Sequence, residues 1–204
     1  MTRIKICGLR SEEDAGIVNE YCPELAGVIF VKGRKRYVPP ERAKTIRQIL
    51  NSDISLVGVF ANEDPCVVAE LIEQRIIDRI QLHGTEDGSY IRQLKRMVHV
   101  PIIQAFSLQT IKDLEAAKQS EADEILLDSG KGGTGEVFDW SILKNMDRPY
   151  ILAGGLTPEN VERAVKTLHP YGVDVSSGVE TGDRKDRKKV GVFVQNVRSI
   201  TDGR

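Results

Sequence analysis

The segment Tyr150-Ile151-Leu152-Ala153-Gly154-Gly155-Leu156-Thr157-Pro158-Glu159-Asn160 contains the signals for a strand, a turn and a helix in immediate succession. Its four apolar residues are typical of a buried strand, and the pair Gly154-Gly155 is typical of a tight turn. Thr157 before Pro158, with Asn160 three residues later, is the signature of a helix N-terminus. The segment therefore predicts one complete βα unit.

The same succession recurs along the whole chain, where short β-branched runs alternate with longer amphipathic stretches. The eight candidate strands are Ile4–Cys7, Leu25–Phe30, Ile54–Phe60, Asp78–Leu82, Pro101–Phe106, Glu124–Asp128, Tyr150–Ala153 and Gly172–Ser176. Eight units in 204 residues leave about 25 residues for each strand, helix and pair of loops. We therefore predict an α/β protein, a single-domain (β/α)8 TIM barrel over residues 1–204, trimmed relative to the usual barrel of about 250 residues.

An open, doubly wound sheet is the structural alternative to a barrel. Its dinucleotide-binding form has Gly-x-Gly-x-x-Gly after the first strand, whereas here that strand ends in Cys7-Gly8-Leu9-Arg10. The last helix is expected to begin near Lys185 and to run through Phe193 and Val197 before fraying at residues 202–204.

The composition excludes several classes of protein. Hydrophobic residues make up 40% of the chain and charged residues 29%, which indicates a folded globular domain and not a disordered or collagen-like chain. The net charge is −1, from 29 basic and 30 acidic residues, so we expect a small-molecule partner and neither nucleic acid nor a membrane. The chain has no apolar run of roughly 20 residues and no signal-peptide pattern at its N-terminus, so we expect a cytoplasmic protein.

The cysteines and histidines give no pattern for a disulfide framework or a metal site. There are three of each, without Cys-x-x-Cys spacing and without a closely spaced histidine pair. They are Cys7, Cys22, Cys66, His83, His99 and His169.

Ligands of parallel βα proteins bind where the strands end, because the loops and the helix N-termini meet there. Two glycine turns, Gly154-Gly155 and Ser177-Gly178, follow the seventh and eighth candidate strands. Backbone N–H groups and a helix N-terminus at such turns favour a bound phosphate. The alternative is that these glycines only form tight turns. Because both turns stand at consecutive strand ends, we favour phosphate binding.

A third glycine cluster, residues 129–135, follows Asp128 and includes Gly132 and Gly133. Its composition suits a flap that folds over a ligand, and a plain flexible loop is the alternative. It is not a Walker loop, because its lysine precedes the glycine pair.

Other strand ends carry reactive or charged side chains. An isolated cysteine on an apolar strand is commonly structural, but Cys7 ends a strand opposite Asp128 across a barrel, where a thiol can act as a base. The run Arg34-Lys35-Arg36 is either a solvated surface or a site for a carboxylate, which arginine binds through two hydrogen bonds. For His83 we expect hydrogen bonding near the site and not catalysis.

Six motifs occur in a fixed order along the chain. They are Lys5-Ile6-Cys7-Gly8-Leu9, Gln81-Leu82-His83-Gly84, Leu127-Asp128, Gly132-Gly133-Thr134-Gly135 with Phe138-Asp139-Trp140, Ala153-Gly154-Gly155-Leu156 and Asp174-Val175-Ser176-Ser177-Gly178-Val179-Glu180. Together they resemble the phosphoribosylanthranilate isomerase family of tryptophan biosynthesis. The resemblance extends from Lys5 to the segment Gly182–Asp186.

The resemblance implies a (β/α)8 barrel that converts N-(5′-phosphoribosyl)anthranilate to 1-(2-carboxyphenylamino)-1-deoxyribulose 5-phosphate, the third step from chorismate to tryptophan. This Amadori rearrangement interconverts an aldose and a ketose and uses neither a metal nor an organic cofactor. By the family pattern Asp128 is the general acid at the furanose ring oxygen, and Cys7 is the general base at C2′. The chemistry needs a raised pKa at the acid and a thiol that ionises, which nearby helix N-termini favour.

The family pattern also implies the substrate-binding residues. Arg36 binds the anthranilate carboxylate, and His83 and Asp174 are further substrate-binding candidates. The phosphate-binding candidates are Gly154, Gly155, Ser177, Gly178, Gly132 and Gly133.

One departure and two rival readings accompany the resemblance. The family's second loop usually reads Ser-x-Arg-x-Val, whereas here Arg34 stands in the serine place, so Arg36 is expected to meet the carboxylate and Arg34 to point outward. The isomerase of histidine biosynthesis looks to use an aspartate pair, which Cys7 argues against. A silent barrel that only binds a sugar phosphate is disfavoured by Cys7, Asp128 and Arg36 together. Both a monomer and a homodimer are compatible with the sequence.

Overall fold

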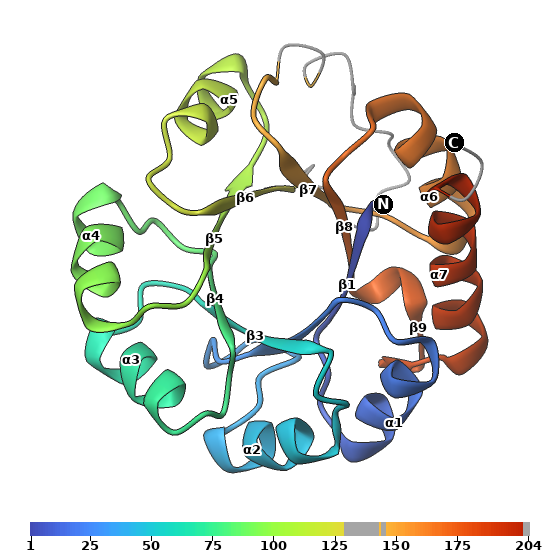
Figure 1. The fold of residues 1–204 in the computed structure, drawn as a ribbon, viewed down its shortest axis with the longest axis horizontal. Coiled ribbons are helices and arrows are strands. Elements are labelled where there is room, and N and C mark those ends of the chain that lie inside the picture. Colours follow the sequence, from blue (N-terminus) through green and yellow to red (C-terminus); the bar gives the residue numbers. More distant parts are fainter. Residues whose placement is uncertain (129–142, 144–145, 202–204) are drawn as a thin grey trace.

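Eight parallel strands form a closed barrel in the order β1 to β8, and the helices pack around it (Figure 1). The structure is a computed structural model that describes residues 1–128, 143 and 146–201. The strands are β1 Arg3–Cys7, β2 Leu25–Ile29, β3 Ser55–Phe60, β4 Arg79–Leu82, β5 Ile102–Ser107, β6 Glu124–Asp128, β7 Tyr150–Ala153 and β8 Gly172–Val175. The α-helices of the described residues are α1 Glu12–Tyr21, α2 Pro40–Ile49, α3 Pro65–Glu73, α4 Gly88–Met97, α5 Ile111–Lys118, α6 Pro158–Leu168 and α7 Arg187–Thr201.

All eight strands coincide with those expected from the sequence, with ends that differ by a residue at most. The barrel closes because β1 pairs in parallel with both β2 and β8. The predicted (β/α)8 barrel is therefore confirmed, and the open sheet is excluded.

The start of the last helix differs from the expectation. Lys185 belongs to a short antiparallel hairpin of β9, Glu180–Thr181, and β10, Arg184–Lys185, which follows the 3-10 turn η2, Ser177–Val179. Helix α7 begins two residues later, where Asp186 accepts a hydrogen bond from the backbone N–H of Lys189 at 3.0 Å. The backbone N–H of Lys185 donates to the buried Asp14 of α1 at 3.1 Å, which ties the hairpin to α1 through a contact that the local sequence does not reveal.

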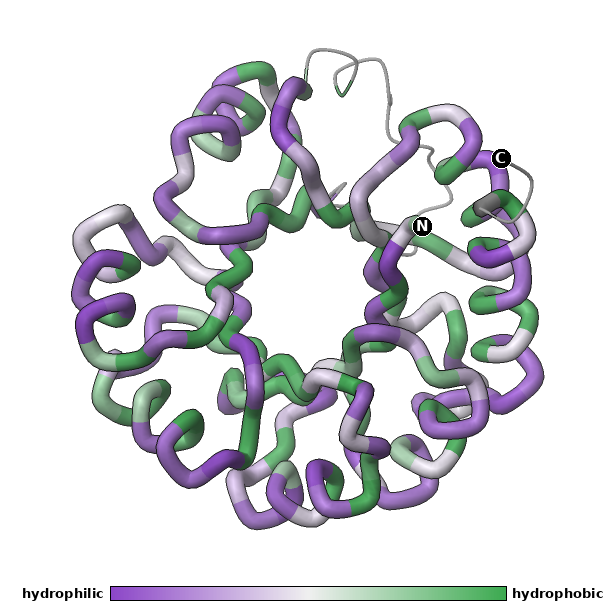
Figure 2. The backbone as a smooth tube through the Cα atoms, in the orientation of Figure 1, coloured by the Kyte–Doolittle hydropathy of each residue, from purple (hydrophilic) through white to green (hydrophobic). Residues whose placement is uncertain are grey.

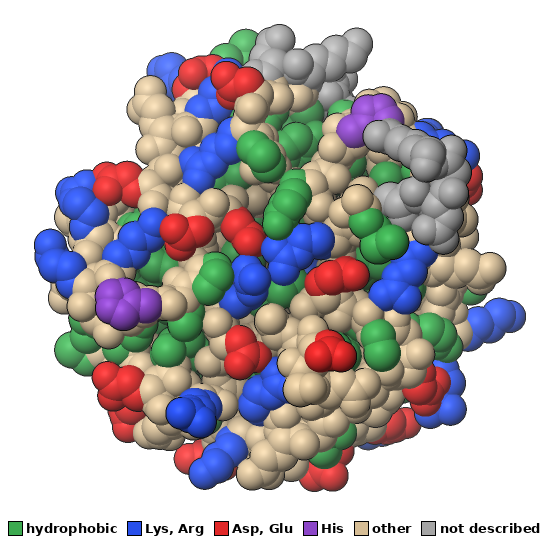
Figure 3. Space-filling view, in the orientation of Figure 1, with side chains coloured by type: hydrophobic (Ala, Val, Ile, Leu, Met, Phe, Trp, Pro, Cys, Tyr) green, Lys and Arg blue, Asp and Glu red, His purple; other side chains and the backbone are tan. Residues whose placement is uncertain are grey.

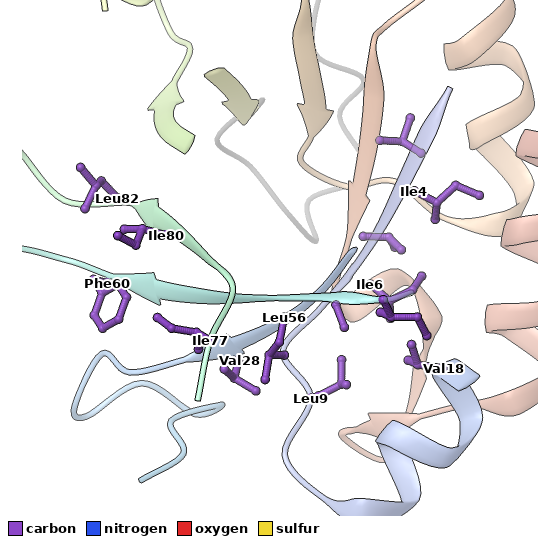
Figure 4. Packing of buried hydrophobic residues seen from close by; sticks show 14 of the residues in the cluster. Ile4, Ile6, Leu9, Val18, Val28, Leu56, Phe60, Ile77, Ile80 and Leu82 are labelled. Carbon is purple, nitrogen blue, oxygen red and sulfur yellow. The ribbon is translucent and has the colours of Figure 1, made fainter. Parts of the chain in front are cut away.

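Successive strand residues point to opposite sides of the barrel wall. Ile4 and Ile6 of β1 belong to the large buried cluster that the strands share with the helices, Val18 of α1 among them (Figure 4). In Figure 2 the hydrophobic segments lie mostly on the strands and on the adjoining sides of the helices. A separate cluster fills the barrel interior with Leu25, Val57, Ile103, Ala105, Leu126, Ile151 and Ala153.

The interior of β1 departs from this apolar pattern. Because Ile4 and Ile6 face the helices, Lys5 and Cys7 face the interior, and both are buried. A lysine inside a barrel needs a compensating charge, since burial disfavours an unpaired ammonium ion.

The surface carries both signs of charge. On the face shown in Figure 3, basic, acidic and hydrophobic side chains are interspersed. Among the described residues, no helix has the length and apolar character that crossing a membrane requires.

Candidate active site

A cavity of about 240 Å³ lies at the ends of the strands. Its lining brings together residues at or just after the ends of β1, β4, β6, β7 and β8, with one residue each from β2 and β3. The lining residues are Cys7, Ile29, Val59, Gln81, His83, Asp128, Ala153, Gly154, Gly155, Leu156, Asp174, Val175, Ser176, Ser177 and Gly178. The structure thus places the expected acid, the expected base and both glycine turns in a single pocket.

Cys7 is the last residue of β1 and pairs in register with Gly27 of β2. A β-carbon built on Gly27 would lie 2.8 Å from the Cys7 Sγ and 3.3 Å from the Lys5 Nζ. The missing side chain of Gly27 therefore leaves the space that the thiol and the ammonium group occupy together.

Burial, the largest influence, raises the pKa of the Cys7 thiol, and the Asp174 carboxylate raises it further. Lys5 and Lys185 act in the opposite direction and offset part of the increase. The pKa of Cys7 nevertheless stays above its ordinary value, whereas the sequence suggested a thiol helped to ionise by helix N-termini. Ionisation of the Cys7 thiol is therefore favoured by the two lysines beside it and opposed by burial and by Asp174.

Lys5 pairs with Asp174, which lies directly beside it in the register of β1 and β8. The Nζ of Lys5 is 3.0 Å from the Asp174 Oδ1, and the two side chains are 1% and 11% exposed. Burial lowers the pKa of Lys5, but Asp174 and Cys7 raise it by more, so the pKa of Lys5 lies above its ordinary value. Lys5 is therefore a buried ammonium ion between a carboxylate and a thiol.

Asp128 ends β6, and its carboxylate lies beside His83 in the pocket lining. The His83 Nε2 and the Asp128 Oδ2 are 3.8 Å apart, and the His83 Nδ1 is 3.4 Å from the amide nitrogen of Gln81. The two ring nitrogens of His83 therefore face the Gln81 amide on one side and the Asp128 carboxylate on the other. His83 thus holds the hydrogen-bonding place that the sequence suggested.

The two glycine turns meet at the edge of the cavity. Gly154 and Gly155 have φ angles of +90° and +62°, in the left-handed region that favours glycine. A β-carbon on Gly178 would lie 1.9 Å from the carbonyl oxygen of Leu156, so only glycine lets the second turn pack on the first. Both turns adjoin the N-terminus of α6, where the Thr157 N–H donates to Asn160 Oδ1 at 2.8 Å. This combination of backbone turns and a helix N-terminus suits an anion.

Arg36 forms a bidentate ion pair with Glu180 that the sequence did not indicate. Its Nε and Nη2 donate to the two carboxylate oxygens at 2.8 and 2.6 Å. The buried Lys185 donates to the same carboxylate at 2.7 Å. Although burial alone would raise it, these two cations lower the pKa of Glu180 to about 2.

Arg36 also lies next to the pocket. A β-carbon on Gly8 would meet the Cδ of Arg36 at 2.6 Å, which places the arginine stem against the residue that follows Cys7. Arg34, by contrast, is exposed, as expected from the sequence.

The remaining predicted residues lie away from this pocket or outside the described part of the chain. Cys22 and Cys66 are exposed free thiols in the helical layer. Gly132 and Gly133 lie outside the described residues. Within the described residues, no group of three His, Cys, Asp or Glu side chains is arranged to hold a metal ion. Lys5, Glu180 and Lys185 form ion pairs beside the cavity and were not singled out from the sequence, although Lys5 and Glu180 belong to motifs quoted above.

Comparison with known proteins places this pocket in context. The family model described as N-(5′-phosphoribosyl)anthranilate (PRA) isomerase matches residues 4–196. A relative from Endomicrobium trichonymphae, named N-(5′-phosphoribosyl)anthranilate isomerase, is 42% identical over 98% of this chain and 100% of its own length.

Solved structures agree with the family match. The phosphoribosyl anthranilate isomerase of Thermotoga maritima is 36% identical, with a TM-score of 0.90 and coverage of 98% of this chain and 100% of that chain. A 35% identical structure, with a TM-score of 0.88 and the same coverage, is the isomerase in complex with reduced 1-(o-carboxyphenylamino)-1-deoxyribulose 5-phosphate. A third, at 34% identity and a TM-score of 0.86 with that coverage, shows monomers of the dimeric T. maritima enzyme.

Proposed function

The chain belongs to the N-(5′-phosphoribosyl)anthranilate isomerase family of tryptophan biosynthesis, and from this premise we propose that Asp128 and Cys7 are the acid and the base of its aldose–ketose isomerisation. The substrate is the small molecule phosphoribosylanthranilate, and the product is 1-(2-carboxyphenylamino)-1-deoxyribulose 5-phosphate. The observation that carries the proposal is that both side chains line one cavity together with the two glycine turns.

The reaction needs two proton transfers, at the ring oxygen and at C2′, two atoms that are both bonded to C1′. Asp128 donates a proton to the furanose ring oxygen, the ring C1′–O bond breaks, and the nitrogen lone pair forms an iminium ion. The Cys7 thiolate then removes the C2′ proton, and the electrons of that C–H bond flow to nitrogen to give an enolamine. Tautomerisation of the enolamine gives the ketone. One acid and one base on opposite sides of a small cavity can perform these steps without moving the substrate.

The rest of the pocket accounts for binding. The glycine turns at Gly154-Gly155 and Ser177-Gly178 offer backbone N–H groups to the phosphate, supported by the N-terminus of α6. Arg36 is proposed to bind the anthranilate carboxylate. Two of its five N–H donors go to Glu180, which leaves donors for the substrate. His83 and Asp174 are proposed to contact the substrate from the cavity wall.

We also propose the working unit of the protein and its location. We propose that the site is compatible with both a monomer and a homodimer; a T. maritima relative is described as dimeric. A base that must stay a free thiol favours a reducing compartment such as the cytoplasm.

The test is the loss of substrate fluorescence when the purified protein meets phosphoribosylanthranilate generated in situ. We expect Cys7→Ser and Asp128→Asn each to lower kcat on the order of 100-fold or more, with KM largely kept. Cys22→Ser is the matched control, because this exposed thiol lies outside the cavity and should leave kcat unchanged. Full activity of Cys7→Ser would remove Cys7 from the mechanism.

A further inference from the structure

Lys5 is a buried cation inside the barrel that the acid–base pair alone does not explain. Its side chain is 1% exposed and points into the interior two residues before Cys7, on the same side of β1. Its Nζ binds the Asp174 Oδ1 at 3.0 Å and shares the space above Gly27 with the Cys7 Sγ. Burying an unpaired ammonium ion costs free energy, so a lysine at this position suggests that its charge has a role.

Charged groups of three further elements also face the thiol. Asp174 of β8 raises its pKa, and Lys185 of β10 lowers it. Arg36, in the loop after β2, is close enough for the thiolate to raise the pKa of its guanidinium, although Glu180 is the first cause of that increase. On the opposite wall of the cavity stand Asp128 and His83.

Of these cations, Lys5 is the one whose counter-ion is itself part of the cavity wall. Lys185 and Arg36 both pair with Glu180, which is outside the cavity lining. The Lys5 ammonium group, in contrast, stands between the thiol and Asp174. Removing it would take away a stabilising charge and leave a thiolate beside a carboxylate, an arrangement in which like charges repel.

We propose that Lys5 is a positioning residue for the reaction, whose ammonium ion stabilises the Cys7 thiolate and shields it from the charge of Asp174. Lys5 does not act as a base, because its own partners hold the proton on it. The proposal rests on the proposed role of Cys7 as the general base. In the first motif, Lys5-Ile6-Cys7, the lysine ammonium ion and the cysteine thiolate would then form an ion pair that favours the ionised form of the thiol.

The direct test is a titration of the Cys7 thiolate by its ultraviolet absorbance, without substrate. The background is the Cys22→Ser, Cys66→Ser protein, in which Cys7 is the remaining cysteine. Lys5→Met keeps the length of the side chain and removes its charge, and we expect it to move the midpoint upward by about one unit or more. Lys5→Arg keeps the charge and should move the midpoint less. An unchanged midpoint in Lys5→Met would overturn the proposal, even where the variant is less stable.

A second variant covers the case in which Lys5→Met does not fold. Asp174→Asn removes the competing anion and leaves the ammonium group to the thiol, so we expect the midpoint to move downward. A midpoint that stays or rises in Asp174→Asn contradicts the proposed shielding. Both variants are compared with the parent by circular dichroism to establish that the barrel is intact.

Kinetics separate this proposal from the proposed function. We expect Lys5→Met to lower kcat on the order of tenfold at neutral pH, to recover activity as the pH rises, and to leave KM nearly unchanged. If Cys7→Ser is fully active, the role of Cys7 as base fails, yet the titration still measures the effect of Lys5 on the thiol. If Cys7→Ser is inactive and the midpoint does not respond to Lys5, the function stands and the role of Lys5 fails.

Discussion

The guanidinium of Arg36 and the carboxylate of Glu180 form a two-bonded ion pair, with contacts of 2.8 and 2.6 Å, that joins the loop after β2 to β9. A planar pair of this kind fixes the direction of the guanidinium as well as its position. Arg36 is thereby fixed beside the first strand end before any substrate binds. This arrangement favours our proposal that Arg36, and not the exposed Arg34, binds the substrate carboxylate.

Arg36→Lys is expected to raise KM by about tenfold or more with a smaller effect on kcat. Lysine keeps the charge but not the planar fork that binds two carboxylates at once, so the substrate carboxylate loses its donor. Arg34→Lys is the matched control, since Arg34 is exposed and should change neither constant. Steady-state kinetics of both variants show which of the two arginines binds the substrate carboxylate. A larger increase in KM from the change at Arg34 would show that Arg34, and not Arg36, binds the substrate carboxylate.

Glu180→Gln is expected to destabilise the fold by about 3 kcal/mol, because it leaves the fully buried Lys185 ammonium without its carboxylate. Urea unfolding measures the loss. Glu13→Gln removes a carboxylate from an exposed ion pair with Arg184 and should cost less than about 1 kcal/mol. Equal effects of the two changes would contradict a structural role for the buried pair.

The same pair gives a pH dependence of defined sign. The pKa of Glu180 is about 2 in the folded chain, below the value near 4.3 of an unfolded glutamate. Its contribution to stability is therefore present above about pH 4.3 and is lost as the pH falls toward 2. Glu180→Gln should show a smaller loss of stability than the parent across this interval.

The barrel followed from the sequence because its signals are local. Each strand is a short apolar run, and the run from Tyr150 to the helix start at Pro158 already contains the complete unit. The strand ends then place Cys7 and Asp128 at one end of the barrel without any knowledge of side-chain packing.

The charge pairs around the site did not follow, because each depends on residues far apart in the sequence. Lys5 and Asp174 become neighbours only when β8 closes the barrel against β1. Arg36 meets Glu180 through a hairpin whose position depends on the Lys185 backbone contact with Asp14. Local patterns assign residues to strand ends, but they do not reveal which opposite charges are brought together.

The pH profile of kcat/KM should carry the raised pKa of Cys7. A general base must be deprotonated, and burial places the thiol pKa above its ordinary value, so activity should rise with pH through that raised value. In Cys7→Asp the base is a carboxylate, which is ionised at neutral pH, and the alkaline rise should disappear. Rates measured between about pH 6 and about pH 10 cover the rise expected for the thiol, while a carboxylate stays ionised throughout this range. A rise at the same position in Cys7→Asp would assign it to another residue.

Gly178→Ala is expected to weaken phosphate binding and lower the stability together, because its β-carbon would lie 1.9 Å from the carbonyl oxygen of Leu156. The obstacle is backbone, so the turn after β8 must move away from the turn after β7, and the proposed phosphate site between the two turns is distorted. We expect KM for the substrate to rise about tenfold or more, while an analogue without phosphate loses little affinity.

Gly16→Ala is the matched control for that change. Gly16 lies within α1, and a β-carbon there meets nothing within 4 Å, so alanine should raise the stability by about 0.5 to 1 kcal/mol and leave KM unchanged. Thermal unfolding and phosphate-analogue titration of both variants separate the two effects. If Gly178→Ala lowered the stability but kept the affinity for the phosphate, the contact between the turns would matter for folding alone, and the phosphate would have to bind elsewhere.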